Sequence, residues 1–386
     1  MSESKFFEEA LAAGEGIFRL APCWVPRNFL VPGGRLKLHP HDLYAFGTQR
    51  GGIDERWLCS VTKADNGRGS LEDEGLSYVV HDHGRALLRE ALREIGETGW
   101  DVLAKLFDNR LPIPFHLHQG EEHAARVKRT PKPEAYYFPP QYNLVEHPFA
   151  CTFFGLDPGT KPADIRRCLT MWDRQDNDIL HHSRAYKTRL GTGWQIDTGI
   201  LHAPGTMVTY EVQGPSDVSA VFQNILDGRP IRRDALVKDV PPELHQDLDY
   251  IIDMIDWEPN VDPHFAEHRF LPPRIAAESD EFSEKSVIYS TPYYSAKELT
   301  VHPGHSVTIK DQAAYGVLIV QGWGMVGKLD VATPTEIRFG QLTNDELFVT
   351  AGKAREGVIV TNRSTKQNLV MLKHFGPAVP ANGDLD

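Results

Sequence analysis

The chain has 386 residues and a formal net charge of −12, with 41% hydrophobic and 24% charged residues. This balance is typical of a globular protein, and the negative charge disfavours nucleic acid or an anionic membrane as a partner. No apolar run approaches the roughly 20 residues that cross a bilayer, and the first residues lack the apolar region of a signal peptide. The four cysteines are scattered, without a Cys-x-x-Cys pair, so we expect reduced thiols and a cytoplasmic protein.

Glycine and proline punctuation and hydrophobic periodicity divide the chain into strand-rich and helical stretches. The first 40 residues read as a short helix and an arm rich in Pro and Gly. Apolar residues at helical spacing predict helices over 84–107, 162–171 and 241–257. Short runs between turn residues predict strands within 42–80, 194–226 and 286–375. A chain of this length exceeds one ordinary core, so we expect two β substructures with helical insertions between them.

Two short segments place polar side chains on the same face of predicted strands. His116 and His118 are two residues apart and therefore point the same way, as do Lys132, Glu134 and Tyr136. Two imidazoles and a carboxylate are a plausible part of a first coordination shell for a divalent transition metal. This spacing favours a metal site built across strands.

The fourth predicted ligand is His202, which follows Gly199 at a predicted strand start. A His-x-His pair in a strand is often only a solvated or hydrogen-bonded face, and taken alone this pair would favour that reading. The added glutamate at strand spacing and the downstream Gly-x-x-His shift the balance to a metal site. We therefore predict His116, His118, Glu134 and His202 as ligands of one divalent ion.

Several segments, in order, resemble the type I mannose-6-phosphate isomerases, which are metal-dependent cupins. That family has a Gln-x-His strand followed by an acidic run, then Gly-Lys-x-Glu, then Gly-x-x-His-Ala, then a glutamate shortly before Ser-Asp. The matching segments here are His116–Ala124, Pro131–Glu134, Gly199–Ala203, and Glu211 with Ser216-Asp217. Weaker matches are Tyr44–Gly47, Glu55–Ser60 and Leu103–Asp108. The likeness covers about residues 40–225 and, more loosely, the β-rich C-terminal part.

The chain departs from the family pattern at three positions. His116 stands where the family has glutamine. Pro114 replaces a serine associated with the substrate phosphate, and Val221 replaces an arginine implicated in catalysis. The loss of a hydroxyl and of a cation argues against a phosphorylated sugar held in the usual way, although Arg229, Arg232 or Arg233 offer replacement charge.

The resemblance implies a mainly β fold with helical insertions, made of two cupin-like jelly-roll β-barrels. It divides the chain into an N-terminal arm, a metal-binding cupin domain with a helical insertion, a helical connector and a C-terminal cupin-like domain without metal. These four parts are expected at 1–40, 41–235, 236–285 and 286–386.

The resemblance further implies a metal-dependent aldose–ketose isomerase, and the departures at Pro114 and Val221 favour a sugar other than mannose 6-phosphate. Glu211 is the expected carboxylate for proton transfer, Lys132 is placed to orient a sugar oxygen, and Asp197 is a weaker candidate. The cofactor would be one divalent metal ion, foremost zinc, with manganese, iron, cobalt and nickel compatible with the same ligands. A small sugar or sugar phosphate is the expected partner, and a homo-oligomer is compatible with the sequence.

Two alternatives share the same ligand set. Three histidines and a glutamate also suit the non-haem iron of a cupin dioxygenase, which would consume oxygen and lose activity with zinc. A sugar-binding cupin without turnover is the second alternative, favoured by the missing arginine and opposed by Lys132 and Glu211.

Overall fold

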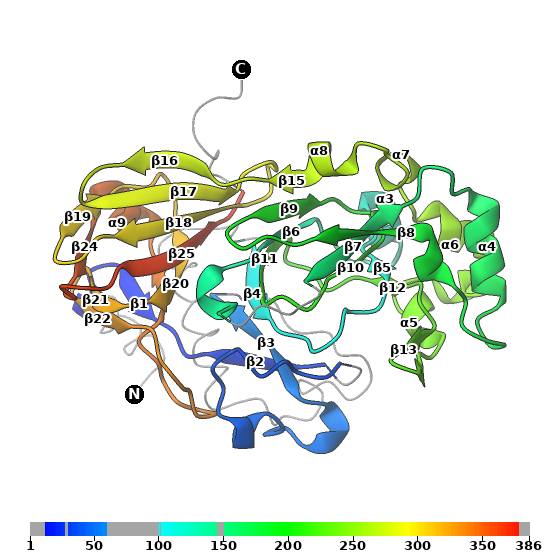
Figure 1. Ribbon diagram of the computed structural model, residues 1–386, viewed down its shortest axis with the longest axis horizontal. Coiled ribbons are helices and arrows are strands. Elements are labelled where there is room, and N and C mark those ends of the chain that lie inside the picture. The colour runs from blue at the N-terminus through cyan, green and yellow to red at the C-terminus, as the bar shows by residue number, and fades with distance from the viewer. Residues whose placement is uncertain (1–11, 28–29, 60–99, 101, 145–149, 378–386) are drawn as a thin grey trace.

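The computed structural model describes residues 12–27, 30–59, 100, 102–144 and 150–377. The predicted fold class, mainly β with helical insertions, is confirmed: strands form two large sheets with smaller sheets beside them, and helices α3 to α8 gather toward one end while α9 lies at the other (Figure 1). None of the helices in these ranges is long and apolar enough to cross a membrane.

The candidate site lies in the first pair of sheets. A seven-stranded sheet has the order β15-β9-β6-β11-β4-β3-β2 and a five-stranded sheet the order β12-β5-β10-β7-β8. The bounds of the first are β2 Cys23–Pro26, β3 Ile53–Leu58, β4 Leu103–Phe107, β6 Glu134–Tyr137, β9 Gly193–Ile196, β11 Thr209–Gln213 and β15 Phe270–Leu271. Those of the second are β5 His116–Leu117, β7 Cys151–Leu156, β8 Ser183–Lys187, β10 His202–Ala203 and β12 Ala220–Val221. Every pairing in them is antiparallel.

The second pair of sheets is built mainly from the C-terminal part of the chain. A seven-stranded sheet has the order β1-β23-β20-β25-β18-β17-β16, and a four-stranded sheet the order β19-β24-β21-β22. The bounds of the first are β1 Ile17–Arg19, β16 Arg274–Glu278, β17 Phe282–Ile288, β18 Ser295–Val301, β20 Tyr315–Gln321, β23 Glu346–Val349 and β25 Leu369–Phe375. Those of the second are β19 Ser306–Ile309, β21 Trp323–Val326, β22 Leu329–Ala332 and β24 Val358–Asn362. A short hairpin joins β13 Ile225–Leu226 to β14 Arg229–Pro230.

The helices are short and mostly begin at recognisable signals. The predicted helix at 162–171 is confirmed as α4 Pro162–Thr170, with proline in its first turn and Ile165, Cys168 and Leu169 buried. The remaining helices are α3 Glu121–Arg126, α5 Asp234–Val237, α6 Leu248–Asp253, α7 Trp257–Asn260, α8 Phe265–Arg269 and α9 Ala351–Glu356. Single turns of 3-10 helix are η1 Pro40–Asp42, η2 Thr48–Arg50, η3 Pro140–Tyr142, η4 Ile179–His182 and η5 Pro242–Leu244.

Two helix predictions need correction. The stretch 241–257 is not one helix but η5, α6 and the start of α7, because Asp247 caps α6 by accepting hydrogen bonds from the backbone N–H groups of Asp249 and Tyr250. In the prediction over 84–107, residues 84–99 lie outside the described residues. Its end is strand β4, since pairing with β3 and β11 on both edges overrides the helical periodicity.

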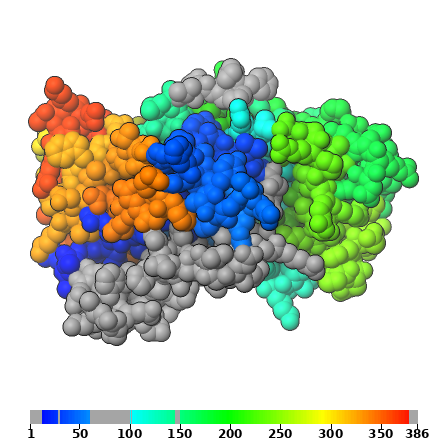
Figure 2. Space-filling view, turned by 90° about the horizontal axis from the view of Figure 1, so that it is seen from below, coloured from blue at the N-terminus to red at the C-terminus, as the bar shows by residue number. Residues whose placement is uncertain are grey.

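The structure also differs from the expected arm and connector. Residues 236–285, expected as a helical connector, contain β15, β16 and the start of β17 after the helices. The arm contributes β1 to the C-terminal sheet and β2 to the N-terminal sheet. On the face shown in Figure 2, the blue N-terminal segment lies beside orange residues of the C-terminal half, where Arg338 pairs with Asp42 and the rings of Phe46 and Phe339 are 4.9 Å apart.

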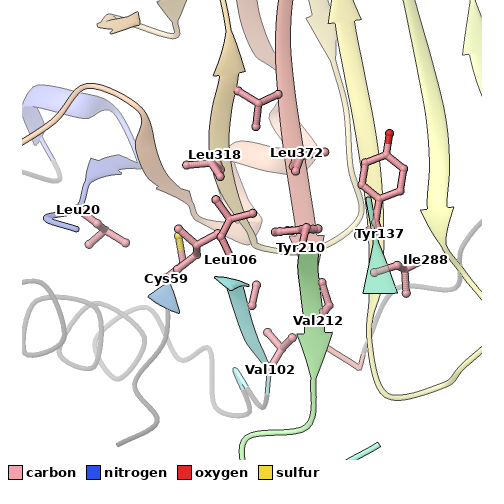
Figure 3. Close-up of a cluster of buried hydrophobic side chains, with 14 of the residues drawn as sticks. Leu20, Cys59, Val102, Leu106, Tyr137, Tyr210, Val212, Ile288, Leu318 and Leu372 are labelled. Atoms are coloured by element: carbon pink, nitrogen blue, oxygen red, sulfur yellow. The ribbon is translucent and has the colours of Figure 1, made fainter. Parts of the chain in front are cut away.

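One hydrophobic core joins the two pairs of sheets. It includes Leu106, Tyr210 and Val212 from the N-terminal half and Leu318 and Leu372 from the C-terminal half (Figure 3). All five side chains are fully buried. Their shared packing stabilises the sheet that carries the candidate site.

Candidate active site

Three imidazoles meet where β5 and β10 pair. His116 and His202 are directly opposite each other in the antiparallel register, and His118 follows two residues after His116 on the same face. Ring centroids are 4.2 Å apart for His116 and His202, 5.0 Å for His116 and His118, and 5.1 Å for His118 and His202. One nitrogen from each ring lies within 4.8 Å of the others. In the part of the chain that the structure describes, this is the one group of three or more potential ligands.

A tight turn positions His202 relative to His118. The N–H of Gly199 donates to the carbonyl of His118 at 2.8 Å, which ties the turn to the end of β5. Gly199 has a φ of +77°, and a Cβ there would lie 2.8 Å from the Cβ of Asp256. Glycine is therefore required in this turn both for its backbone conformation and for space.

Each imidazole is held through Nδ1 by a backbone carbonyl. The acceptors are Pro114 at 2.7 Å for His116, Val218 at 2.7 Å for His118 and Ile200 at 2.8 Å for His202. A carbonyl only accepts, so each Nδ1 carries the proton and the lone pair is on Nε2. This arrangement orients metal-binding histidines in known proteins.

Glu134, from β6, lies against two of the three imidazoles. Its Oε2 lies 3.0 Å from Nε2 of His118 and its Oε1 lies 3.0 Å from Nε2 of His202. Neither Nε2 atom has a hydrogen-bond partner, although both rings are buried. Lone pairs of neutral imidazoles thus face carboxylate oxygens, which is unfavourable unless a cation lies between them. The donor set therefore fits a bound divalent metal.

Electrostatics keep these groups in the states that bind a metal. Burial lowers the pKa of His118 to about 4, with Lys132 adding to the effect. Burial and the neighbouring His202 and His118 place the pKa of His116 well below its usual range. Burial alone would raise the pKa of Glu134, but Lys132 and the histidines outweigh it and hold that pKa well below its usual range. The result is that His116 and His118 are neutral beside an ionised Glu134.

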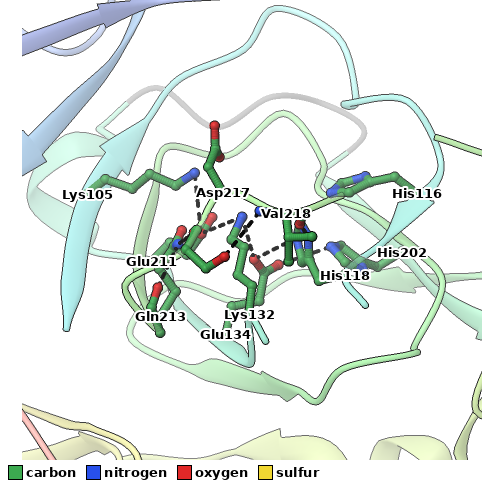
Figure 4. Close-up of polar contacts among 12 residues, drawn as sticks. Lys105, His116, His118, Lys132, Glu134, His202, Glu211, Gln213, Asp217 and Val218 are labelled. Atoms are coloured by element: carbon green, nitrogen blue, oxygen red, sulfur yellow. Dashed lines mark hydrogen bonds and ion pairs between the residues drawn. The ribbon is translucent and has the colours of Figure 1, made fainter. Parts of the chain in front are cut away.

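The two predicted catalytic residues lie beside this cluster (Figure 4). Lys132 Nζ is 3.2 Å from Oε2 of Glu134 and 3.6 Å from Oε1 of Glu211. Glu211 is in β11, opposite Tyr136 in β6 and Lys105 in β4, and is almost fully buried. Burial and Glu134 raise its pKa to about 7, against the opposing effect of Lys105 and Lys132. A carboxyl group with this pKa can exchange a proton near neutral pH.

Four further charged residues of the site were not predicted from the sequence as site residues. Lys105 Nζ lies 3.3 Å from Oε1 of Glu211 and 3.5 Å from Oε1 of Glu55. Arg27, from the arm, pairs with both Glu55 and Asp217. A lone lysine within the apolar run of β4 was the available signal for Lys105, because a charge in a buried strand needs a partner. No local pattern marks Arg27.

Other candidate residues occupy different surroundings. Asp197 pairs with Arg269 and accepts from Gln195 Nε2 at 3.0 Å, so its carboxylate is engaged outside the histidine cluster. Arg232 is exposed and pairs with Asp234, and Arg233 donates to the His245 carbonyl at 3.5 Å. Arg229 is exposed in β14. None of these arginines has a described contact with the cluster.

Tyr136, His123 and Val221 complete the predicted surroundings. The Tyr136 hydroxyl donates to Oε1 of Glu134, so this residue restrains the carboxylate as well as forming a wall. His123 lies in α3, with its Nε2 at 3.4 Å from Asp253, rather than in the cluster. Val221 is opposite His116 in the β5–β12 pairing, which places an apolar side chain on the face that carries the imidazoles.

Comparison with known proteins finds similar structures but no match to a family model or to a curated sequence. The mannose 6-phosphate isomerase of Bacillus subtilis is similar in structure, with a TM-score of 0.60 and 15% identity over 92% of this chain and 98% of that chain. A mutant phosphomannose isomerase of Salmonella typhimurium has a TM-score of 0.55 and 11% identity over 93% of this chain and 100% of that one.

A mannose 6-phosphate isomerase bound with zinc and yttrium is also similar, with a TM-score of 0.54 and 12% identity over 93% of this chain and 99% of that chain. The similarity thus spans both pairs of sheets and the helices between them. The chain has the fold of the mannose 6-phosphate isomerases.

Proposed function

We propose that this protein is a metal-dependent aldose–ketose isomerase. The observation that carries the proposal is the contact of His118 and His202 Nε2 atoms with the Glu134 carboxylate at 3.0 Å each, next to a carboxyl group whose pKa is raised to about 7. The first feature calls for a cation, and the second supplies a proton acceptor beside it. His116, His118, Glu134 and His202 would hold the ion, with zinc as the first candidate.

The bound ion would act as a Lewis acid that polarises the sugar carbonyl and acidifies the adjacent C–H bond. Glu211 then accepts the proton from C2 of the open-chain aldose and returns it to C1, while the hydroxyl proton passes from O2 to O1. Lys132, a cation between Glu134 and Glu211, donates a hydrogen bond to a sugar oxygen and orients the reacting carbons toward Glu211.

The preferred sugar is unphosphorylated. Val221 lies beside His116 and brings no charge, and Pro114 has neither a hydroxyl nor a backbone N–H, while its carbonyl is occupied by His116. A phosphate that loses its water needs paired cations or donors, and these positions provide none. We therefore expect mannose 6-phosphate to be a poor substrate compared with free mannose, lyxose and related aldoses.

The test combines metal analysis with sugar turnover. Protein reconstituted with zinc, manganese, iron or cobalt is incubated with free and phosphorylated aldoses in D2O, and NMR follows both isomerisation and deuterium incorporation. His202→Ala serves as the metal-site variant, and His264→Ala, an exposed histidine on the helical side, as the matched control. We expect wild-type protein and His264→Ala to isomerise a free aldose. His202→Ala should lose both the bound metal and this activity.

Other outcomes point to the competing functions. Oxygen consumption with iron but not with zinc would identify a dioxygenase. Saturable sugar binding without isomerisation or deuterium incorporation under any metal would identify a binding protein. A preference for the phosphate ester would overturn the substrate proposal while leaving the isomerase proposal intact.

A further inference from the structure

Arg27 of the N-terminal arm is fixed between two buried carboxylates. Its Nε and Nη2 donate to Oε1 and Oε2 of Glu55, each at 3.1 Å. Its Nη1 and Nη2 donate to the Asp217 carboxylate at 3.0 and 3.2 Å, and its backbone N–H donates to Asp54 at 2.9 Å. A planar guanidinium that meets two carboxylates in this forked manner sets their positions more firmly than an ammonium group can.

These contacts determine what Lys105 can do. Lys105 lies between Glu55 and Glu211, 3.5 and 3.3 Å from the nearest oxygen of each. Glu55 already receives Arg27 and the indole N–H of Trp57 at 2.7 Å. Because Glu55 is satisfied by these donors, the charge of Lys105 remains directed at Glu211. Asp217, Arg27, Glu55, Lys105, Glu211, Lys132 and Glu134 form a chain of alternating charge that leads from the arm to the histidines.

We propose that Arg27 is a positioning residue that keeps Lys105 directed at Glu211, and so sets the proton-accepting state of that carboxylate. The proposal rests on the proposed function, in which Glu211 transfers the proton. Arg27 follows β2 and reaches Asp217, which lies between β11 and β12, 190 residues further along the chain.

Removing Arg27 would redistribute the remaining charge. Burial opposes ionisation of Glu55 and Asp217, yet Arg27 keeps both pKa values below their usual ranges. Without Arg27, Glu55 would draw Lys105 away from Glu211. The titratable groups that surround Glu211 are Lys105 on β4, Lys132, Glu134 and Tyr136 at β6, Glu55 on β3, and Tyr294 just before β18. Loss of the nearest cation leaves Glu211 protonated to a higher pH.

The experiment compares zinc-loaded wild-type protein with Arg27→Met, Arg27→Lys and the control Arg35→Met. Arg35 is an arm arginine that pairs with Asp108 at 2.6 Å, outside the charge chain. Two readouts are used: the pH profile of kcat and kcat/KM, and NMR titration of 13C-labelled glutamate carboxyls, with the Glu211 signal assigned by Glu211→Gln. Thermal unfolding and zinc content verify that each variant is folded and loaded.

In Arg27→Met, the Glu211 midpoint is expected to rise by roughly one pH unit, and kcat below that midpoint to fall about tenfold with little change in KM. Arg35→Met should leave the midpoint unchanged. An unchanged midpoint in folded Arg27→Met overturns the proposal.

If Arg27→Met does not fold, Arg27→Lys is used to test the proposal. A single ammonium cannot reproduce the four contacts to Glu55 and Asp217, so a smaller rise of the midpoint is expected and its absence overturns the proposal. The proposed function can fail separately. Wild-type protein without isomerase activity would reject it, while the carboxyl titration would still report on Arg27.

Discussion

Each pair of sheets buries a cluster of charged side chains, and the two clusters are satisfied to different degrees. In the C-terminal half, Lys297 and Lys373 each contact both Glu284 and Asp311, at 2.5 to 3.2 Å. Two cations and two carboxylates form a closed, neutral ring. In the N-terminal half, Nε2 of His118 and Nε2 of His202 face the Glu134 carboxylate, and neither nitrogen has a hydrogen-bond partner.

The difference separates a structural charge cluster from a functional one. In a closed ring every buried charge has oppositely charged partners, which offset the cost of removing it from water. A cluster with unpaired acceptors is costly unless something binds there, so its retention in a buried location favours a binding or catalytic role. The same β architecture thus carries one cluster whose charges pair with each other and one whose donor atoms suit a cation.

The largest effect on stability is expected from breaking the closed ring. Lys373→Met would leave Glu284 and Asp311 with Lys297 alone, and an uncompensated buried charge costs about 3–5 kcal/mol. The free energy of unfolding, measured with urea, should fall by that amount while zinc content of the remaining folded protein is unchanged. Lys285→Met is the control, because Lys285 follows Glu284 in β17 but lies outside the ring. Equal effects of both changes would show that the ring is not the source of stability.

A change in the charge cluster of the N-terminal half should lower turnover rather than stability. Glu211→Gln keeps the shape of the side chain but removes the proton acceptor, so kcat should fall by about 10²-fold or more with zinc and fold retained. Glu298→Gln makes the same chemical change in the C-terminal half, where Glu298 only accepts from the Tyr137 hydroxyl at 2.8 Å. Wild-type kcat in Glu211→Gln would remove this residue from the mechanism.

The pH dependence of kcat tests the comparison further. Of the two charge clusters, the one in the N-terminal half contains the carboxyl group, Glu211, that is proposed to transfer a proton. The pKa of Glu211 is raised to about 7 by burial and Glu134. A base must be ionised, so kcat should increase as pH rises through neutrality, and a bound cation would move the midpoint lower. The midpoint, at which kcat reaches half of its maximum, is measured by quenching the reaction at a series of pH values and analysing the sugars by NMR. A rate that falls over the same range would assign Glu211 the role of an acid instead.

The smallest effect is expected at Val221, which lies at the edge of the N-terminal charge cluster. Val221→Arg would add a cation beside His116, and a partly exposed charge pair contributes about 0.2–1 kcal/mol. The ratio of kcat/KM for mannose 6-phosphate to that for mannose should therefore rise a few-fold, and Val221→Gln, without charge, should leave it near the wild-type value. A ratio that falls in the arginine variant would place the phosphate elsewhere.

Sequence reasoning located the centre of the site better than its surroundings. Alternation along a strand placed His116 with His118 and Lys132 with Glu134, and the structure brings these side chains together with His202 and Glu211. The roles of these residues remain proposals. Arg27 was not predicted, because its contact with Asp217 joins residues that are 190 positions apart in the sequence. Such a contact depends on tertiary packing rather than on local pattern.

The same limit explains the misplaced helices. Strand β4 contains residues that also suit a helix, and only its two partner strands decide in favour of extended backbone. The connector was expected to be helical to residue 285, but β15 and β16 exist because they pair with β9 and β17. Edge strands of this kind are specified by their neighbours.

The pairing of β1 has a consequence for synthesis of the chain. Ile17 lies opposite Val349 in β23, so β1 finds its partner only after the residues up to Val349 have left the ribosome. Until then, the apolar side chains of Ile17 and Phe18, which are buried in the finished protein, remain without their cover. The pairing of β1 is thus completed late, and a chain that ends before β23 presents uncovered apolar residues of the kind that chaperones and proteases recognise.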